Sequence, residues 1–436
     1  MFSIHKALGP LALAFACAAA PACALQPTSD EDGSEVSEDA ITDVPQSVVE
    51  RQAIGNCWIY AHASWLESMN LKATGKEFDS SQTYVTYWHW FEQVVNGEID
   101  GEKEISTGGW FRTANYLVTT YGVAAEKDFA PSDADAEMST VQKNALTKVN
   151  QELATGRLAT DAARRDRKLV RQVLDEAFGL STAVRAQLDK VFGKTVARNL
   201  TTKSRTTGKL LASTANTFVI RASSFKTAYT RWDATAKKSV PVSTTLDVAA
   251  KEWREVSYPT WTSGRRDVQI RLQRALHDAQ PVPLSWFVDF NALSSSASSG
   301  SPQGSFTKAL LDKSGPGRQG GHMTVFEDYE VTLPSGEVLA AGTTLEASKP
   351  ADKAKLDAAL SPSAKIRFYR IKNSWGAARL DRGFVPGMGG YHDLYADYID
   401  GPLKSCTETE NEKPLAERGC TSSTPGLRAV YLPPGY

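Results

Sequence analysis

The chain has 436 residues, more than one domain usually holds, so we expect a full-sized core together with a large insertion or a second lobe. Its 10 tryptophans, 41% hydrophobic residues and net charge of −1 are typical of a globular protein, and they argue against a fibrous, disordered or globally nucleic-acid-binding chain. The overall charge therefore points to no particular partner.

The N-terminus has the pattern of a secretory signal peptide. Lys6 precedes the apolar run ALGPLALAFACAAAPACA, which is too short for a membrane anchor and ends in small residues. We expect residues 1–24 to be removed after Ala24, so that the mature protein is exported to the periplasm or outside the cell. A lipoprotein modified at Cys17 or Cys23 is the alternative. No later segment approaches about 18 uninterrupted apolar residues, so no membrane span is expected in the mature chain.

Helices dominate the next part of the chain. The acidic, serine-rich residues 25–44 predict a disordered linker, because they have nothing to pack with. Residues 45–125 predict a helical lobe: NCWIYAHASWLESMNLKATG forms one helix ending near Gly75, and SSQTYVTYWHWFEQVV and GGWFRTANYLVTTYG follow after short loops. Cys57 lies in the first turn of the first helix, where free N–H groups and the macrodipole favour a thiolate.

Residues 126–260 predict a mainly helical insertion. MSTVQKNALTKVNQELATG and RKLVRQVLDEAFGLSTAVRAQLDKVFG are amphipathic, and Leu169, Val173 and Phe178 belong to one apolar face. The later residues 194–238 are rich in Lys and Arg. They indicate a solvated basic face; contact with a polyanion or a membrane surface is the alternative, and no specific nucleic-acid motif supports it.

Strands dominate residues 261–436. After the helix RDVQIRLQRALHDAQ, the stretch PVPLSWFVDF predicts a strand and NALSSSASSGSPQG a mobile loop. HMTVFEDYEVTL and KIRFYRIKNSWG also read as strands, because they are rich in β-branched and aromatic residues. Helices first and antiparallel strands afterwards predict an α+β fold of two lobes.

Three cysteines remain after the signal peptide is removed. In an exported chain, Cys406 and Cys420 are close enough in sequence to pair and close a loop of about 15 residues. Cys57 is left over. An odd thiol in an oxidising compartment indicates either pairing with another molecule or a reactive site.

A cysteine nucleophile needs a base and a group that orients the base, so the histidines matter. His62 lies on the helix of Cys57 and points away from it, while His277 and His392 lie in a polar helix and a loop. His89, between aromatic residues, is interpreted as a packing or surface residue.

His322 is the best candidate for the base. It follows Gly320 and Gly321 at the start of a strand, where a cleft between lobes would form. On a neighbouring strand, the side-chain oxygen of Asn373 can accept a hydrogen bond from the imidazole, and Trp375 can shield that bond from water.

The blocks GNCWIYA, GGHMTVFEDYE and YRIKNSWG resemble, in this order, the catalytic blocks of papain-like cysteine peptidases. EFDSSQTYV and GGWFRTANYLVTTYGV resemble the later helix and the substrate-cleft Gly-Gly segment of that family. The resemblance covers about residues 45–125 and 265–400. It implies that the two lobes are catalytic and adopt the papain-like fold, with a helical left lobe and an antiparallel β right lobe.

The resemblance also implies roles for single residues. Cys57 is the nucleophile, His322 the general base and acid, and Asn373 the orienting group, while the backbone of Gly108 and Gly109 binds an extended peptide. Neither a metal nor a cofactor is needed.

The chain departs from the family pattern in two places. Cys57 and His322 are much farther apart than the usual ~130–150 residues, and the insertion between them resembles the bleomycin hydrolase branch, which consists mostly of aminopeptidases that often assemble as rings. Ile54, at the position of a disulfide cysteine in secreted relatives, favours the same branch, but its members are usually intracellular. The glutamine of the oxyanion hole, Gln52, lies five residues before Cys57 instead of six.

We therefore expect a cysteine peptidase that hydrolyses peptides or proteins through a thioester, with the oligomeric state left open. The alternatives are an inactive papain-like protein that binds peptides and an amidase or transpeptidase acting on cell-wall peptides. The C-terminal LRAVYL reads as a strand that completes the β lobe and does not enter the cleft, so endopeptidase action is slightly favoured over aminopeptidase action.

Overall fold

The computed structural model describes residues 44–99, 103–196, 217–296, 300–377, 383–407, 413–414 and 417–436. The expected signal peptide, nearly all of the acidic linker and the centre of the basic segment lie outside these ranges. None of the helices within the described ranges is both long enough and apolar enough to span a membrane.

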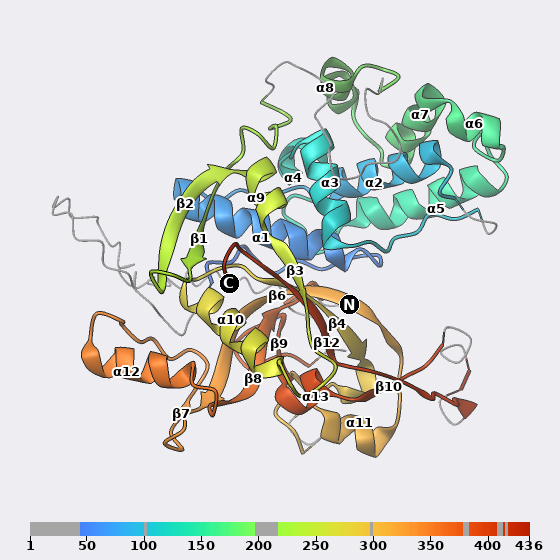
Figure 1. The fold of residues 1–436 in the computed structure, drawn as a ribbon. Coiled ribbons are helices and arrows are strands. Elements are labelled where there is room, and N and C mark those ends of the chain that lie inside the picture. The colour runs from blue at the N-terminus through green and yellow to red at the C-terminus, as the bar shows by residue number, and fades with distance from the viewer. Residues whose placement is uncertain are drawn as a thin grey trace, which may run out of the picture. The chain divides into compact units, whose positions relative to one another are not determined.

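Three helices form the first part of the fold: α1 (Cys57–Thr74), α2 (Gln82–Asn96) and α3 (Phe111–Tyr121) (Figure 1). Every residue of α1 from Cys57 to Asn70 is buried, because α2, α3 and three strands of later segments pack around it. A helix enclosed on all sides is apolar or small over most of its circumference, and the buried polar exceptions His62 and Glu67 of α1 are hydrogen-bonded. α1 ends at Gly75, whose φ of 65° closes the helix.

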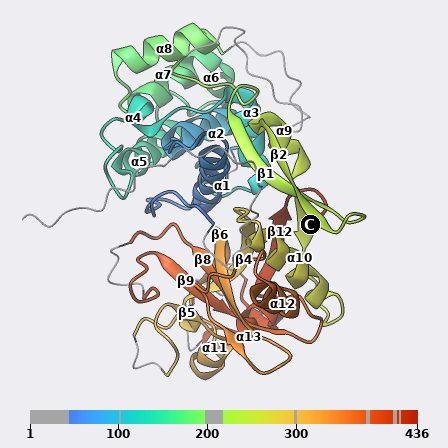
Figure 2. The ribbon, with the colours of Figure 1, turned by 90° about the vertical axis from the view of Figure 1, so that its left-hand side faces the viewer.

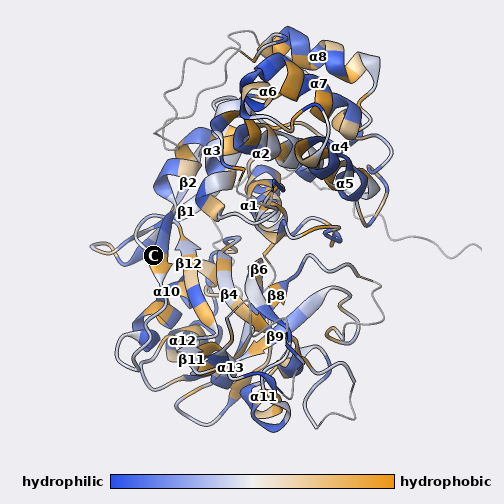
Figure 3. Ribbon diagram, turned by 90° about the vertical axis from the view of Figure 1, so that its right-hand side faces the viewer, coloured by the Kyte–Doolittle hydropathy of each residue, from blue (hydrophilic) through white to orange (hydrophobic). Residues whose placement is uncertain are grey.

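The insertion continues with helices that pack on α2. They are α4 (Glu126–Phe129), α5 (Thr140–Ala154), α6 (Asp161–Arg165), α7 (Arg167–Ala177) and α8 (Thr182–Phe192). Helices α7 and α8 alternate between hydrophilic and hydrophobic segments in Figure 3, as expected when one face is buried and the other exposed. The break between α7 and α8 lies at Gly179, whose φ of 63° favours glycine.

The second half of the region expected to be mainly helical contains strands. The antiparallel hairpin β1 (Lys226–Asp233) and β2 (Lys238–Thr245) is followed by α9 (Leu246–Glu252) and β3 (Arg254–Ser257). β1 packs along α1, and Asn70 Nδ2 donates to the carbonyl of Lys226 over 2.7 Å. The Thr- and Val-rich hairpin is therefore part of the wall around α1.

A large sheet forms the rest of the fold, in the order β3-β12-β4-β6-β8-β9-β5 (Figure 2). Its strands are β4 (Pro283–Asp289), β5 (Ser305–Phe306), β6 (Gln319–Thr332), β8 (Lys365–Lys372), β9 (Tyr391–Tyr395) and β12 (Leu427–Leu432), with β7 (Val338–Leu339) pairing with β6. All pairs are antiparallel except β5 with β9, which is parallel. The α+β fold class expected from the sequence is confirmed.

Shorter elements surround this sheet. They are α10 (Arg265–His277), the 3-10 turn η1 (Phe290–Ala292), α11 (Lys308–Ser314), α12 (Pro350–Ala359), α13 (Ala396–Asp400) and the strand pair β10 (Leu403–Ser405) and β11 (Ser422–Thr424). A disulfide joins Cys406 to Cys420, whose Cα atoms are 4.3 Å apart, next to this strand pair.

Candidate active site

Cys57 is the first residue of α1, and its side chain is 9% exposed. The preceding residue, Asn56, does not cap the helix with its side chain. Its Nδ2 donates instead to Thr86 Oγ1 over 3.1 Å and to Gln142 Oε1 over 2.7 Å. The loop before Cys57 is thus fixed by buried polar bonds to α2 and α5, and the first N–H groups of α1 receive no side-chain cap.

Cys57 and His322 line the same cleft, which has a volume of about 660 Å³. One wall comes from α1 and the residues around Gly108 and Gly109, and the other from β4 and β6. The Cys57 thiol also receives a backbone hydrogen bond from Met323, the residue after His322. The fold therefore brings the two residues together from opposite sides of the cleft.

His322 is held on three sides. Its Nε2 lies 2.7 Å from Asn373 Oδ1. The indole of Trp375 stacks on the imidazole with a centroid distance of 5.0 Å and an angle of 25°, and Trp286 contacts the ring edge-on at 5.5 Å. His322 is the fourth residue of β6 and not its first, so the antiparallel pairing with Trp286 fixes the backbone on both sides of it.

Burial is the largest influence on the pKa values of Cys57 and His322. It raises the pKa of the Cys57 thiol to about 11, opposed by backbone hydrogen bonds from Met323, Trp58 and Cys57 itself. It lowers the pKa of the His322 imidazole to about 4, opposed by the bond to Asn373. Burial thus favours the neutral thiol and the neutral imidazole, and it acts against the helix end, which favours a thiolate.

Gly108 and Gly109 lie in the cleft beside Cys57. A Cβ atom on Gly109 would lie 2.4 Å from the indole of Trp58, so only glycine allows the backbone to approach this ring. Trp58 Nε1 also donates to the carbonyl of Thr107 over 3.0 Å. The Gly-Gly backbone is thus held against the residue that follows Cys57.

Gln52 lies beside Ser374 and is not one of the described residues that line the cleft. Its Nε2 donates to the carbonyl of Ile54 over 2.8 Å, and its Oε1 accepts from Ser374 Oγ over 2.7 Å. Since a side-chain amide has two N–H groups, one donor is left beyond the bond to Ile54.

The structure adds cleft residues that sequence reasoning missed. His89, interpreted as a packing or surface residue, lines the cleft with its ring edge-on to Trp58 at 4.8 Å. Trp286 and Arg428 line it from the sheet. The aromatic context of His89 was ambiguous, and the positions of Trp286 and Arg428 depend on strand pairing that the sequence does not reveal.

The remaining described histidines have other partners. His392, expected in a loop, lies instead in β9, because this segment pairs with β8, and its Nδ1 is 3.4 Å from Asn373 Nδ2. His62 Nε2 lies 2.8 Å from Asn115 Oδ1, and His277 Nε2 lies 2.6 Å from the hydroxyl of Tyr329. Burial lowers the pKa of each to about 4. Neither lines the cleft. Among the described residues, no group of three or more His, Cys, Asp or Glu side chains is arranged to hold a metal ion.

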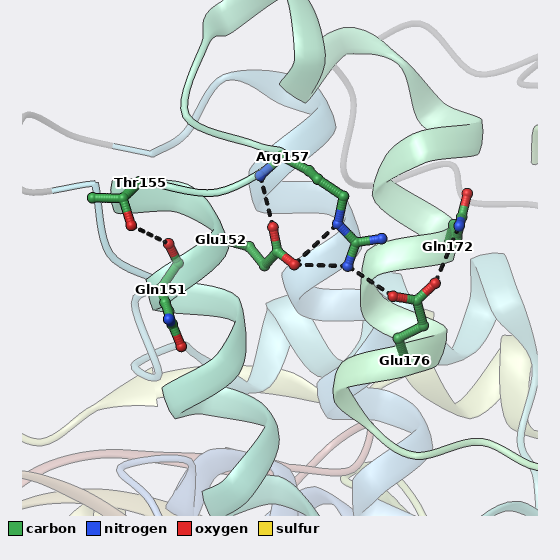
Figure 4. A network of polar contacts seen from close by, with 6 residues as sticks. All are labelled: Gln151, Glu152, Thr155, Arg157, Gln172 and Glu176. Atoms are coloured by element: carbon green, nitrogen blue, oxygen red, sulfur yellow. Dashed lines mark hydrogen bonds and ion pairs between the residues drawn. The ribbon is translucent and has the colours of Figure 1, made fainter.

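A second hollow of about 400 Å³ lies in the insertion, between α5 and α7. Three of its charged groups are paired with one another: Arg157 Nη2 lies 2.7 Å from both Glu152 Oε1 and Glu176 Oε2 (Figure 4). Gln172 also donates to Glu176 over 3.1 Å. Because these charges satisfy one another, the network explains how the two helices are joined and does not indicate a reactive site.

Comparison with known proteins gives only distant likenesses. Neither a protein-family model nor a curated protein matches the chain. Solved structures similar to it include PepW from Lactobacillus rhamnosis, with 12% identity over 89% of this chain and 81% of that one and a TM-score of 0.41. Xylellain, a cysteine protease from Xylella fastidiosa, has 12% identity over 83% and 81% and a TM-score of 0.34. Digestive procathepsin L 3 from the larval midgut of Tenebrio molitor has 13% identity over 91% and 69% and a TM-score of 0.33. At these values the likenesses assign neither a family nor an activity.

Proposed function

We propose that the chain is a papain-like cysteine peptidase in which Cys57 is the nucleophile, His322 the general base and acid, and Asn373 the orienting group. The observation that carries this proposal is the arrangement of the site. A cysteine at the start of a buried helix shares a cleft with a histidine, and the side-chain oxygen of a buried asparagine lies 2.7 Å from Nε2 of that histidine.

The reaction begins from the neutral pair. His322 takes the thiol proton as the Cys57 sulfur attacks the peptide carbonyl, and then gives that proton to the departing amine. The acyl group is left on the sulfur as a thioester. Water then attacks the thioester while His322 accepts its proton, and collapse of this intermediate returns the thiol and releases the acid.

Asn373 and Trp375 prepare the base for this step. The Asn373 oxygen accepts from Nε2–H and so favours the tautomer in which Nδ1 can take the thiol proton. The indole of Trp375, stacked on the ring, keeps water from this bond.

The developing oxyanion has a donor in the backbone N–H of Cys57, at the uncapped end of α1. We propose the remaining N–H of Gln52 as a second donor, which must turn toward the cleft when substrate binds. The backbone of Gly108 and Gly109 offers hydrogen-bonding groups to an extended peptide.

The C-terminal tail supports action within peptide chains. β12 pairs with β3 and β4, and the hydroxyl of Tyr436 lies 2.7 Å from Thr230 Oγ1 on the β1–β2 hairpin. The last four residues are not among those that line the cleft. We therefore propose endopeptidase action, with aminopeptidase action as the less favoured form. The likeness to the bleomycin hydrolase branch and the formation of oligomers stay expectations.

We also propose that the protein is exported, with lipoprotein anchoring as the variant of this proposal. The Cys406–Cys420 disulfide supports it, because such bonds persist in oxidising compartments. Analysis of culture fractions, with N-terminal sequencing of the mature chain, tests this part of the proposal.

A peptide-library digest tests the function. The wild-type protein should cleave internal bonds, and Cys57→Ala should abolish cleavage while its thermal unfolding stays like that of the wild type. Cleavage of cell-wall peptides alone would favour the amidase or transpeptidase. Peptide binding by the wild type without any turnover would favour the inactive binding protein.

A further inference from the structure

One charged side chain in the cleft has no counter-ion among the residues that the structure describes. Arg428 lines the cleft and is exposed to solvent. Within the described residues no carboxylate lies within ion-pair distance of its guanidinium, including Glu98, the one described acid that lines this cleft. Its charge is therefore available to an anionic ligand that enters the cleft.

An irregularity in the pairing of β12 with β4 turns the side chain of Arg428 toward the cleft. Along β12, Leu427 pairs with Trp286 and Ala429 pairs with Ser285, so Arg428 is an extra residue between two consecutive partners. This is a β-bulge, which redirects a side chain and is common beside active sites. The main chain of Arg428 still accepts a hydrogen bond from the N–H of Tyr258, which anchors the bulge.

The bulge lies close to the proposed base. Trp286, the partner of Leu427, is also the partner of His322 on β6. The Arg428 guanidinium lies over the ring of Phe287, 5.4 Å from its centroid. A Cβ atom on Gly321, the neighbour of His322, would lie 3.4 Å from Arg428 Nη1. Because Gly321 has no side chain, the guanidinium of Arg428 can lie next to β6, and the ring of Phe287 holds it there.

We propose that Arg428 is a specificity-determining residue that binds a carboxylate of the substrate close to the scissile bond. An arginine presents a planar set of donors that matches a carboxylate, and stacking on Phe287 pre-organises this set. The carboxylate belongs either to an Asp or Glu side chain or to the C-terminus of a short peptide. The inference deepens the proposed function and rests on it.

The test uses hexapeptides that differ at one residue, Glu, Gln or Lys, placed at either of the two positions before the cleaved bond. Each peptide is made with a free and with an amidated C-terminus. The wild type should cleave the Glu peptide with about tenfold higher kcat/KM than the Gln peptide, as expected for a charge-assisted hydrogen bond. Arg428→Gln should remove this preference, and Arg428→Glu should turn it toward Lys. If the C-terminus is the source of the carboxylate, the three free peptides are cleaved alike, amidation lowers the kcat/KM of each about tenfold, and this effect of amidation is lost in Arg428→Gln.

Arg112→Gln is the matched control, because Arg112 is 78% exposed, lies 3.8 Å from Glu255 and does not line the cleft. This variant should keep the wild-type preference. Equal cleavage of all the peptides by the wild type, whether free or amidated, or a carboxylate preference that survives in Arg428→Gln, would overturn the inference.

Binding to Cys57→Ala separates this inference from the proposed function. Calorimetry with the same peptides measures recognition without chemistry, and the Glu peptide should bind about tenfold more tightly than the Gln peptide. Such binding without hydrolysis by the wild type would reject the peptidase and keep the carboxylate site. Hydrolysis by the wild type with no charge preference in either assay would keep the peptidase and reject the carboxylate site.

Discussion

At the scale of single residues, the site combines a buried thiol with a buried imidazole, and each charged form is costly there. Burial places the pKa of Cys57 at about 11 and that of His322 at about 4. Between these values both groups are neutral. Cys57 then becomes nucleophilic only as His322 removes its proton, so the chemistry depends on the pair and not on the helix end alone.

The pH dependence of Cys57 alkylation tests this ionisation state. A thiol with a pKa near 11 has about 10² times less thiolate at pH 7 than a free cysteine, so iodoacetamide should label Cys57 slowly at pH 6, and the rate should rise as the pH increases. Peptide mass spectrometry measures the label, with glutathione as the reference thiol. Rapid labelling that is constant from pH 5 to 8 would show a resting thiolate instead.

At the scale of elements, α1 delivers Cys57 while β6 and the end of β8 deliver His322 and Asn373. The Gly-Gly segment adds a close contact to this arrangement, because the Trp58 indole lies where a side chain on Gly109 would go. The neighbouring glycine is different: a Cβ on Gly108 would meet only Ser106 Oγ, at 3.7 Å.

Alanine substitutions at these glycines should therefore differ. Gly109→Ala forces the Trp58 ring or the loop to move and should lower the free energy of unfolding by about 1–3 kcal/mol, whereas Gly108→Ala should change it by less than about 0.5 kcal/mol. Denaturant unfolding of both variants measures the difference. Equal free energies of unfolding for the two variants would mean that Gly109 is not packed closely against Trp58.

Much at this scale could be predicted from sequence, and the reasons are local. The apolar run after Cys57 and the Gly75 cap specify α1, and the β-branched residues around His322 and Asn373 specify their strands. The β-bulge at Arg428 could not be predicted, since it depends on how β12 aligns with a strand about 140 residues earlier. The β1–β2 hairpin could not be predicted either, because buried and exposed residues do not alternate regularly along its two strands.

At the scale of the whole described chain, the C-terminal residues 433–436 are packed against other segments and do not line the cleft. Tyr436 is 3% exposed, and its hydroxyl bonds to Thr230 and to Asp278. The N–H of Trp232 donates to the carbonyl of Pro434 over 3.0 Å. The tail thus ties the hairpin and α10 to the sheet.

Deleting residues 433–436 should destabilise the protein without changing its mode of cleavage. The loss of a buried tyrosine with its hydrogen bonds should cost about 2–4 kcal/mol of unfolding free energy. Denaturant unfolding measures this cost, and digestion of peptides with free or acetylated N-termini measures the mode of cleavage. An intact protein that needs a free α-amino group, and a deletion variant that does not, would contradict this account.

The most direct test of whether Cys57 is the nucleophile is to trap the thioester that it should form. The wild-type protein is mixed with an activated peptide ester, quenched in acid within the first turnovers and digested for mass spectrometry. The peptide that carries Cys57 should bear the mass of the acyl group early in the reaction and lose it at later times. A Cys57→Ser variant quenched in the same way should not carry it. Turnover of the ester with no acyl group on Cys57, or with the group on another residue, would contradict this role of Cys57.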